Sequence, residues 1–275
     1  SEIFRERRFV KLAQESIHFI HPTAYQRGVT TMLDYKEILD RCQVDLVRAF
    51  GTAALRTAQN GLDFIREVRD KTGISIQLID GDQEAEYILR GVRLAIPFDK
   101  TPKLIMDIGG GSVEFLIANE NNVFWMRSFP VGVAVLYRTF HRHEPITENE
   151  VFELRQYLTA QLLPLSEALK THPCSQLVGV SGTFDVLENL LERTFTAPTY
   201  SINKTNRFPQ LLQQFKQADL EERLHLKGVP QYRADMIVVA MILIDMVLKA
   251  SGVEEIWVSQ YDLKEGMVSE LLESH

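Results

Sequence analysis

Apolar and polar residues alternate with two different periods along the chain. In the first third, short strand-like runs alternate with segments of helical spacing, such as Tyr25, Val29 and Met32 on one face. This alternation predicts an α/β domain. Strands are expected at residues 2–12, 45–52 and 75–79, and helices at residues 22–39, 61–71 and 83–89.

From Leu104 onward the pattern changes to consecutive strands. Residues 104–108, 113–118 and 123–129 are joined by glycine-rich and Asn-Asn turns, which predicts a meander of hairpins. Further helices are expected over residues 148–169, after residue 183 to about 191, over 234–250 and over 263–272. Pro164 is expected to bend or break the first of these, and Gly252 to close the third. Strands are expected over 176–179 and 255–259, and a polar loop over 194–208.

A length of 275 residues favours two domains. The best boundary is the connector at residues 96–102, in which two prolines flank charged residues. We therefore predict an N-terminal α/β domain over residues 1–98 and a C-terminal α/β domain over residues 99–275.

Composition and charge narrow the classes of function. The formal net charge is −7, which argues against a general binder of nucleic acid or of anionic membranes. The longest apolar run, residues 236–248, contains Asp245 and is shorter than the roughly 20 residues that a membrane span needs. Cys42 and Cys174 are the only cysteines and suggest no disulfide framework, and we find no secretory signal. A cytoplasmic protein is expected.

The segment from Asp107 to Glu114 carries the strongest chemical signal. It reads Asp-Ile-Gly-Gly-Gly-Ser-Val-Glu, with Gly109, Gly110, Gly111 and Ser112 between two carboxylates. Adjacent glycines let backbone amides approach phosphate oxygens, and Asp107 could order Mg²⁺ through water. A strand follows the loop, so neither a Rossmann nor a P-loop site fits. The alternative is an ordinary glycine-rich hairpin turn with an exposed glutamate, and we favour phosphate chemistry.

Weaker signals lie elsewhere. Arg56 ends the small-residue segment at residues 51–56 and is either an anion ligand or a surface arginine. The acids at residues 80–86 suit a helix start, and composition cannot select a catalytic base among them. Val180-Ser181-Gly182-Thr183 is either a phosphate-binding helix N-terminus or a simple Ser/Thr cap. His141 and His143 are expected to be solvated loop residues rather than metal ligands.

Taken in order, these motifs resemble the exopolyphosphatase/guanosine pentaphosphate phosphohydrolase (Ppx/GppA) family over nearly the whole chain. The resemblance rests on Gly-Thr-Ala-Ala-Leu-Arg at residues 51–56, Gly-Asp-Gln-Glu-Ala at 81–85, Asp-Ile-Gly-Gly-Gly-Ser-Val-Glu at 107–114 and Ser-Gly-Thr at 181–183. Arg-Ala-Asp-Met-Ile at 233–237 and Ser-Gln-Tyr-Asp-Leu-Lys-Glu-Gly at 259–266 add to it.

The resemblance implies the actin-like ATPase fold, with two ribonuclease-H-like domains and an active-site cleft between them. It implies a hydrolase that uses Mg²⁺ and water to release terminal phosphate from inorganic polyphosphate or guanosine pentaphosphate. By position, Glu84 would be the general base and Arg56 a phosphate ligand. Asp107 would hold the metal, and Glu114 would position metal or water. The phosphate loops would comprise Gly109, Gly110, Gly111 and Ser112 on one side and Gly182 and Thr183 on the other.

The chain departs from the family pattern in several places. The family's first strand and its Asp-x-Gly-Ser-Asn phosphate loop are expected to be missing, and a chain without them could be inactive. Ser181 replaces a glycine, and Gln83 replaces an acid. The rivals are a non-catalytic binder or sensor of alarmone or polyphosphate and an ATP-using enzyme of the same superfold. The apolar C-terminal helices could also support a homodimer.

Overall fold

The structure is a computed structural model that describes residues 3–273, and its chain divides into two units, Ser1–Asp80 and Gly81–His275. This division differs from the predicted boundary at 98/99. The reason is that α4 (Gly81–Ala95) packs closely on α12 (Leu263–Glu273). A Cβ built on Gly91 would lie 2.0 Å from the carbonyl oxygen of Asp262, so the backbones meet where α4 crosses the start of α12.

The N-terminal unit is built on two packed helices, α1 (Pro22–Arg41) and α3 (Gly61–Thr72). Val29 and Val68 are fully buried between them, and the rings of Tyr25 and Phe64 meet edge to face at 5.2 Å. Strands β1 (Ala49–Gly51) and β2 (Ile76–Leu78) pair in parallel, and the short α2 (Ala53–Thr57) follows β1.

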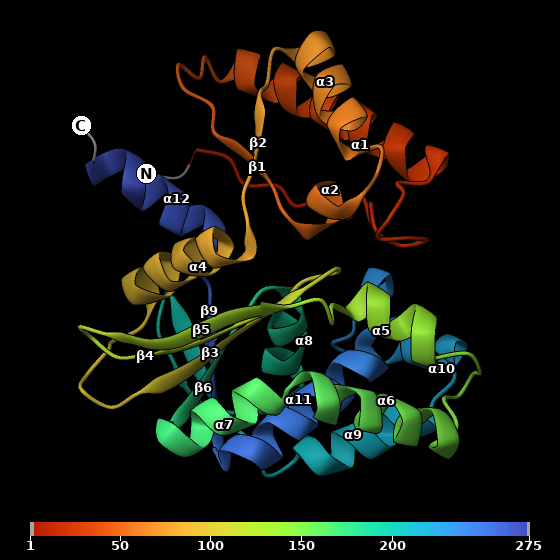
Figure 1. The fold of residues 1–275 in the computed structure, drawn as a ribbon, viewed down its shortest axis with the longest axis vertical. Coiled ribbons are helices and arrows are strands. Elements are labelled where there is room, and N and C mark those ends of the chain that lie inside the picture. Colours follow the sequence, from red (N-terminus) through yellow and green to blue (C-terminus); the bar gives the residue numbers. More distant parts are fainter. Residues whose placement is uncertain (1–2, 274–275) are drawn as a thin grey trace. The chain divides into compact units, whose positions relative to one another are not determined.

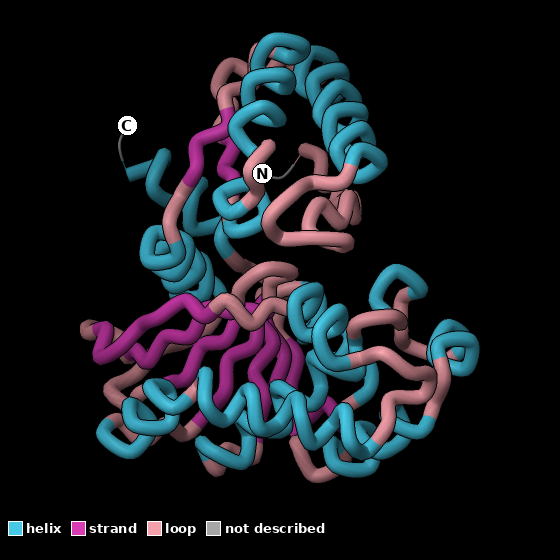
Figure 2. The backbone as a smooth tube through the Cα atoms, turned by 45° about the vertical axis from the view of Figure 1, so that its right-hand side comes forward, coloured by secondary structure: helices cyan, strands magenta, loops and turns pink. Residues whose placement is uncertain are grey.

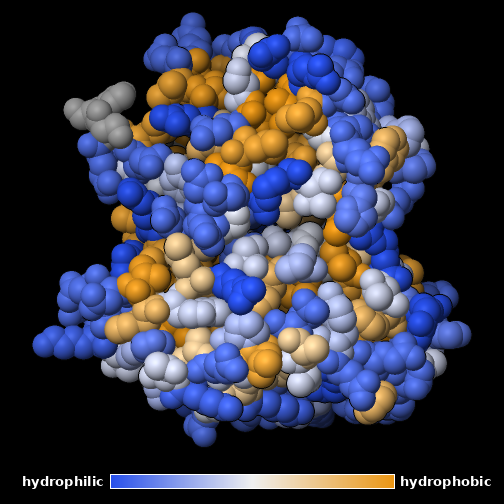
Figure 3. All heavy atoms as spheres, in the orientation of Figure 1, coloured by the Kyte–Doolittle hydropathy of each residue, from blue (hydrophilic) through white to orange (hydrophobic). Residues whose placement is uncertain are grey.

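The strand predicted over residues 2–12 is wrong, since residues 3–11 form neither helix nor strand. Residues 5–8 are all charged, and no described strand pairs with residues 3–11. Apolar surface is visible over the N-terminal unit (Figure 3). Phe4, Leu46 and Val47 of this unit are exposed. The predicted absence of the family's first strand and phosphate loop stays a prediction.

The C-terminal unit contains a mixed sheet of seven strands in the order β5-β4-β3-β6-β9-β8-β7. Strands β3, β6 and β9 run parallel, and every other neighbouring pair is antiparallel. The strand bounds are β3 (Lys103–Ile108), β4 (Val113–Ala118), β5 (Val123–Phe129), β6 (Gln176–Val180), β7 (Glu192–Thr196), β8 (Tyr200–Lys204) and β9 (Glu255–Ser259). The predicted meander of β3 to β5 is therefore confirmed.

Helices cover both faces of this sheet (Figures 1 and 2). On one face, α4 packs through Ala85, Ile88 and Val92 onto alternate residues of the central strands. The opposite face carries the larger core, which includes nearly the whole of α11. The helices of that core are α5 (Val133–Phe140), α6 (Glu148–Gln161), α7 (Leu163–Thr171), α8 (Gly182–Leu190), α9 (Phe208–Gln217) and α11 (Ile237–Ser251).

Several local predictions can be compared directly. The predicted break near Pro164 is confirmed, since α6 ends at Gln161 and Pro164 lies in the first turn of α7. Gly252 follows α11 with a positive φ of 69°, as expected. The predicted polar loop over 194–208 is wrong, because β7 and β8 form a hairpin that extends the sheet through β9. Within residues 3–273, no helix combines the length and apolar character that crossing a bilayer requires.

Candidate functional site

Two acids of the glycine segment lie side by side on the sheet. Asp107 of β3 pairs with Glu114 of β4 and with Val180 of β6, and Glu114 pairs in turn with Ser128 of β5. Side chains at paired positions share a face of a sheet. This is the face covered by α4, because Val180 belongs to the core that α4 completes. Ser128 Oγ donates a hydrogen bond of 2.7 Å to Glu114 Oε1.

Glu84 lies in the first turn of α4 and is turned toward the same face. It precedes Ala85 and stands four residues before Ile88, both of which pack on the sheet. Gly81 approaches the neighbouring strand so closely that a Cβ there would lie 2.5 Å from Cβ of Ser128. This close approach sets the start of α4 over the end of β5, next to Glu114.

Burial distinguishes one candidate base among the acids of residues 80–86, which composition could not do. Glu84 is only 8% exposed, whereas Asp80, Asp82 and Glu86 are exposed. Asp107 and Glu114 are 8% and 1% exposed. Three carboxylates are thus withdrawn from bulk water in the layer between α4 and the sheet.

The glycine loop is held from one side by α5. The backbone amides of Gly132, Val133 and Ala134 donate to the carbonyl oxygens of Gly111, Gly109 and Gly110, at 3.2, 3.0 and 3.0 Å. Within residues 3–273, the amides of Gly110, Gly111 and Ser112 donate to no backbone carbonyl. An ordinary hairpin turn with an exposed glutamate is contradicted, because Glu114 is buried.

The second loop, residues 180–183, adjoins Asp107 through the pairing of β3 with β6. Ser181 is the N-cap of α8, yet its side chain makes no capping hydrogen bond, so the simple Ser/Thr cap is not formed. Its φ of 69° and ψ of 174° lie in a region that favours glycine. The first amides of α8, those of Gly182 and Thr183, have no carbonyl in a preceding turn to accept from them.

Arg233 lies against this loop and was not among the predicted site residues. It ends a 3₁₀ turn, Gln231–Arg233, and a Cβ built on Gly182 would lie 1.9 Å from its Nη2. Gly182 therefore leaves the space that the guanidinium occupies. The available signal was the Arg-Ala-Asp motif at residues 233–235, which indicated family resemblance but no role.

Arg56 belongs to the N-terminal unit, where it lies on α2 after the β1 strand. Its guanidinium donates a hydrogen bond to the carbonyl oxygen of Ile79 in the same unit. The contact fixes the arginine beside the end of the β2 segment. Its role as a phosphate ligand stays a prediction.

The donor set can be tested for fit to a metal ion. Among residues 3–273, no group of three or more His, Cys, Asp or Glu side chains is arranged to hold one. Asp107 and Glu114 are two paired carboxylates, and Mg²⁺ usually takes one or two carboxylates while keeping waters and substrate oxygens. These residues fit an Mg²⁺ ion completed by substrate rather than a closed protein site.

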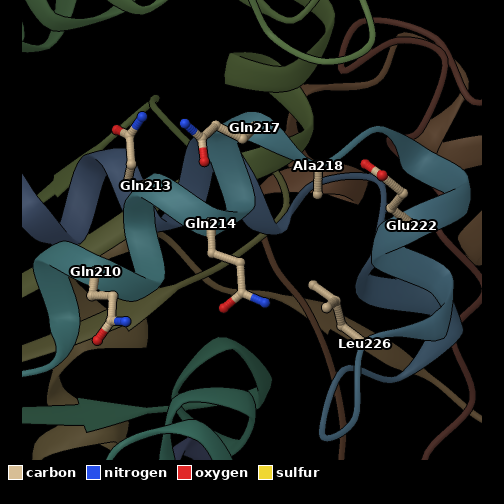
Figure 4. A pocket seen from close by; sticks show the side chains of 7 residues that line it. All are labelled: Gln210, Gln213, Gln214, Gln217, Ala218, Glu222 and Leu226. Carbon is tan, nitrogen blue, oxygen red and sulfur yellow. The ribbon is translucent and has the colours of Figure 1, made fainter.

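A separate groove of about 660 Å³ lies beside α9 and α10 (Leu220–His225) (Figure 4). Four glutamines of α9 line it, together with Ala218, Glu222 and Leu226. The lining contains a carboxylate but no cation. It therefore offers no positive charge to a polyanionic ligand.

Comparison with known proteins agrees with the geometry. The model of the Ppx/GppA phosphatase family matches residues 1–275. The chain belongs to the Ppx/GppA phosphatase family. Exopolyphosphatase 1 of Mycobacterium bovis and that of Mycobacterium tuberculosis are 27% identical to it over 253 residues, which cover 90% of this chain and 73% of theirs.

Solved structures of the Ppx/GppA family agree with the fold. An exopolyphosphatase from Cytophaga hutchinsonii is 37% identical, with a TM-score of 0.91 over 96% of this chain and 88% of that one. The Aquifex aeolicus family member is 25% identical, with a TM-score of 0.75 over 97% of this chain and 87% of its own. The chain is thus an α/β phosphatase-family protein with a mixed sheet.

Proposed function

We propose that this phosphatase-family protein hydrolyses terminal phosphoanhydrides with the help of Mg²⁺, releasing orthophosphate from inorganic polyphosphate. The observation that carries the proposal is the combination of three adjacent loop amides with three buried carboxylates at one end of the sheet. The relatives named exopolyphosphatase support polyphosphate as the substrate class. Guanosine pentaphosphate carries the same terminal group and is the alternative substrate.

In this proposal Glu84 accepts a proton from the attacking water. The water oxygen forms a bond to the terminal phosphorus, the bridging P–O bond breaks, and the shortened chain leaves as a phosphate anion. The amides of the glycine loop and Arg233 bind phosphate oxygens, and Arg56 is proposed as a further ligand. Asp107 and Glu114 would hold Mg²⁺, which would neutralise charge on the transferred phosphoryl group.

We further propose that the C-terminal unit is a ribonuclease-H-like domain of the actin-like ATPase type. The support is the order β5-β4-β3-β6-β9, in which an antiparallel meander is followed by two parallel strands. The site lies where the parallel strands β3 and β6 end, which is where ligands bind in open α/β sheets.

The experiment measures orthophosphate release from short polyphosphate, long polyphosphate, guanosine pentaphosphate and ATP, with Mg²⁺ and with a chelator. Glu84→Gln tests the base, and the matched control is Glu86→Gln, an exposed acid two residues further on the same helix. We expect Mg²⁺-dependent release that falls at least ~100-fold in Glu84→Gln and stays unchanged in Glu86→Gln.

The other outcomes assign different functions. Binding of polyphosphate or guanosine pentaphosphate without release would favour a non-catalytic sensor. Turnover confined to ATP would favour an ATP-using enzyme. Equal activity of Glu84→Gln and wild type would refute the assigned base.

A further inference from the structure

Arg223 is a fully buried cation outside the proposed chemistry. It lies on α10, is 0% exposed, and all three guanidinium nitrogens donate. Nε donates to the carbonyl oxygen of Ala234 at 2.8 Å, and Nη1 donates to that of Ala218 at 2.6 Å. Nη2 lies 2.7 and 2.8 Å from the two oxygens of Glu144. One side chain therefore joins three loops.

The carboxylate of Glu144 is the charge partner of Arg223. It also lies 3.4 Å from Nε2 of His141, whose side chain is buried, so the expectation of a solvated His141 is wrong. Burial lowers the pKa of His141, and Glu144 opposes that effect. A neutral His141 leaves the Glu144 carboxylate to Arg223. The hydrogen bonds and the ion pair thus fix the position of this arginine side chain.

The hydrogen bond to Ala234 connects Arg223 to the site. Ala234 directly follows Arg233, and the backbone amide of Arg233 donates to Pro230 within the same short turn. A 3₁₀ turn of three residues has few bonds of its own, so outside contacts must fix its orientation. Arg223 supplies such a contact, because its buried Nε donates to the carbonyl oxygen of Ala234, the residue after Arg233.

We propose that Arg223 is a positioning residue that holds Arg233 against Gly182 for binding of a substrate phosphate. The inference rests on the proposed function, which makes Arg233 a phosphate ligand. Removal of Arg223 would release the Ala234 carbonyl, and the guanidinium of Arg233 would lose its fixed place beside the second loop. Substrate affinity is then expected to fall more than the rate of the chemical step.

A second ion pair provides a control for loss of stability alone. Arg155 of α6 donates to Asp245 of α11 at 2.6 Å, and Asp245 is 5% exposed. Asp245 also accepts from Lys249 on the same helix. This pair joins two helices in the larger core, and within residues 3–273 neither of its side chains hydrogen-bonds to the turn of Arg233. Arg155→Met should lower stability without changing substrate affinity.

The experiment is a double-mutant cycle on Arg223→Lys and Arg233→Ala, with Arg155→Met beside it. The Kd for a short polyphosphate, KM and kcat are measured at a temperature where each variant is folded by circular dichroism. We expect Arg223→Lys to raise Kd and KM about 10-fold with kcat within about 2-fold. In the Arg233→Ala background the same change should have no further effect. Glu144→Gln is expected to raise Kd and KM by a smaller factor, and it replaces Arg223→Lys in the cycle if that variant does not fold.

The outcomes separate this inference from the proposed function. Additive effects of the two substitutions, or an unchanged Kd in Arg223→Lys, would overturn the positioning role while leaving hydrolysis intact. Binding without release would overturn the proposed hydrolysis, and the cycle on Kd would still test Arg223. An equal rise in Kd for Arg155→Met would show a general loss of structure and overturn the inference.

Discussion

Gly132 is expected to be essential to the glycine loop although it lies outside that loop. A Cβ built at this position would lie 2.4 Å from both the carbonyl carbon and oxygen of Gly110, and 2.5 Å from the carbonyl carbon of Gly111. The neighbouring atoms are backbone and cannot turn aside as a side chain would. Gly132→Ala therefore requires the loop to move by about 1 Å relative to α5.

The magnitude follows from two effects of that movement. Forcing an extra methyl group into packed structure costs ~1–3 kcal/mol of unfolding free energy, which corresponds to a fall in Tm of ~2–12 °C. Misplacing one loop amide that binds a phosphate oxygen costs a further ~1.5–3 kcal/mol in the transition state, or about 10- to 150-fold in kcat/KM. The activity loss should exceed what the unfolded fraction explains.

The assay combines thermal unfolding with orthophosphate release from short polyphosphate well below Tm. Gly110→Ala is the control for stability, because a Cβ there meets no atom within 4 Å and its Tm should stay near that of wild type. Wild-type Tm and wild-type kcat/KM in Gly132→Ala would refute the role assigned to this contact.

Three further predictions concern the second loop and the protein's acid stability. Gly182→Ala should raise KM about 10-fold in Michaelis analysis with little change in Tm, because the nearest atoms to its Cβ are those of the Arg233 guanidinium, the far end of a long side chain that can move aside. An unchanged KM would contradict this. Ser181→Gly should stabilise the protein by ~1–2 kcal/mol in urea unfolding, since the φ of 69° costs a serine more than a glycine, and a lower midpoint would argue against strain at this position. Burial raises the pKa of Glu150, but hydrogen bonds from Thr147 and His143 outweigh it and lower the pKa from 4.5 to about 2. The stabilisation from Glu150 is present above pH 4.5 and is lost as the pH falls toward 2. The loss is ~1–2 kcal/mol of unfolding free energy, a value reduced because its partner His143 is exposed. Glu150→Gln should flatten the dependence of Tm on pH in that range, and an unchanged slope would count against this acid.

The sequence pattern predicted the helices and strands that depend on apolar spacing and turn residues within the segment itself. The helices at α1 and α3, the meander of β3 to β5 and strand β9 follow from apolar spacing and turn residues. The hairpin of β7 and β8 was missed because polar residues outnumber apolar ones in both strands, and β8 is held by pairing with β9, more than fifty residues away. Long-range pairing overrides a weak local signal of this kind.

The candidate site shows the same limit. The glycine loop and its two acids could be predicted because they are contiguous in sequence. Glu84 required burial to distinguish it from the exposed acids beside it, and Arg233 required the close approach to Gly182. The sequence places Arg233 fifty-one residues after Gly182, so no spacing rule links them.

The hydrogen bonds from α5 to the glycine loop have a consequence for the peptide planes. In a trans peptide the C=O and the following N–H point in opposite directions. Since α5 holds the carbonyls of Gly109, Gly110 and Gly111, the amides of the next residue in each case must point away from α5. A run of three glycines would otherwise be the most flexible part of the chain. The loop loses its conformational entropy during folding rather than on binding, so an anion that binds meets amide donors that are already aligned.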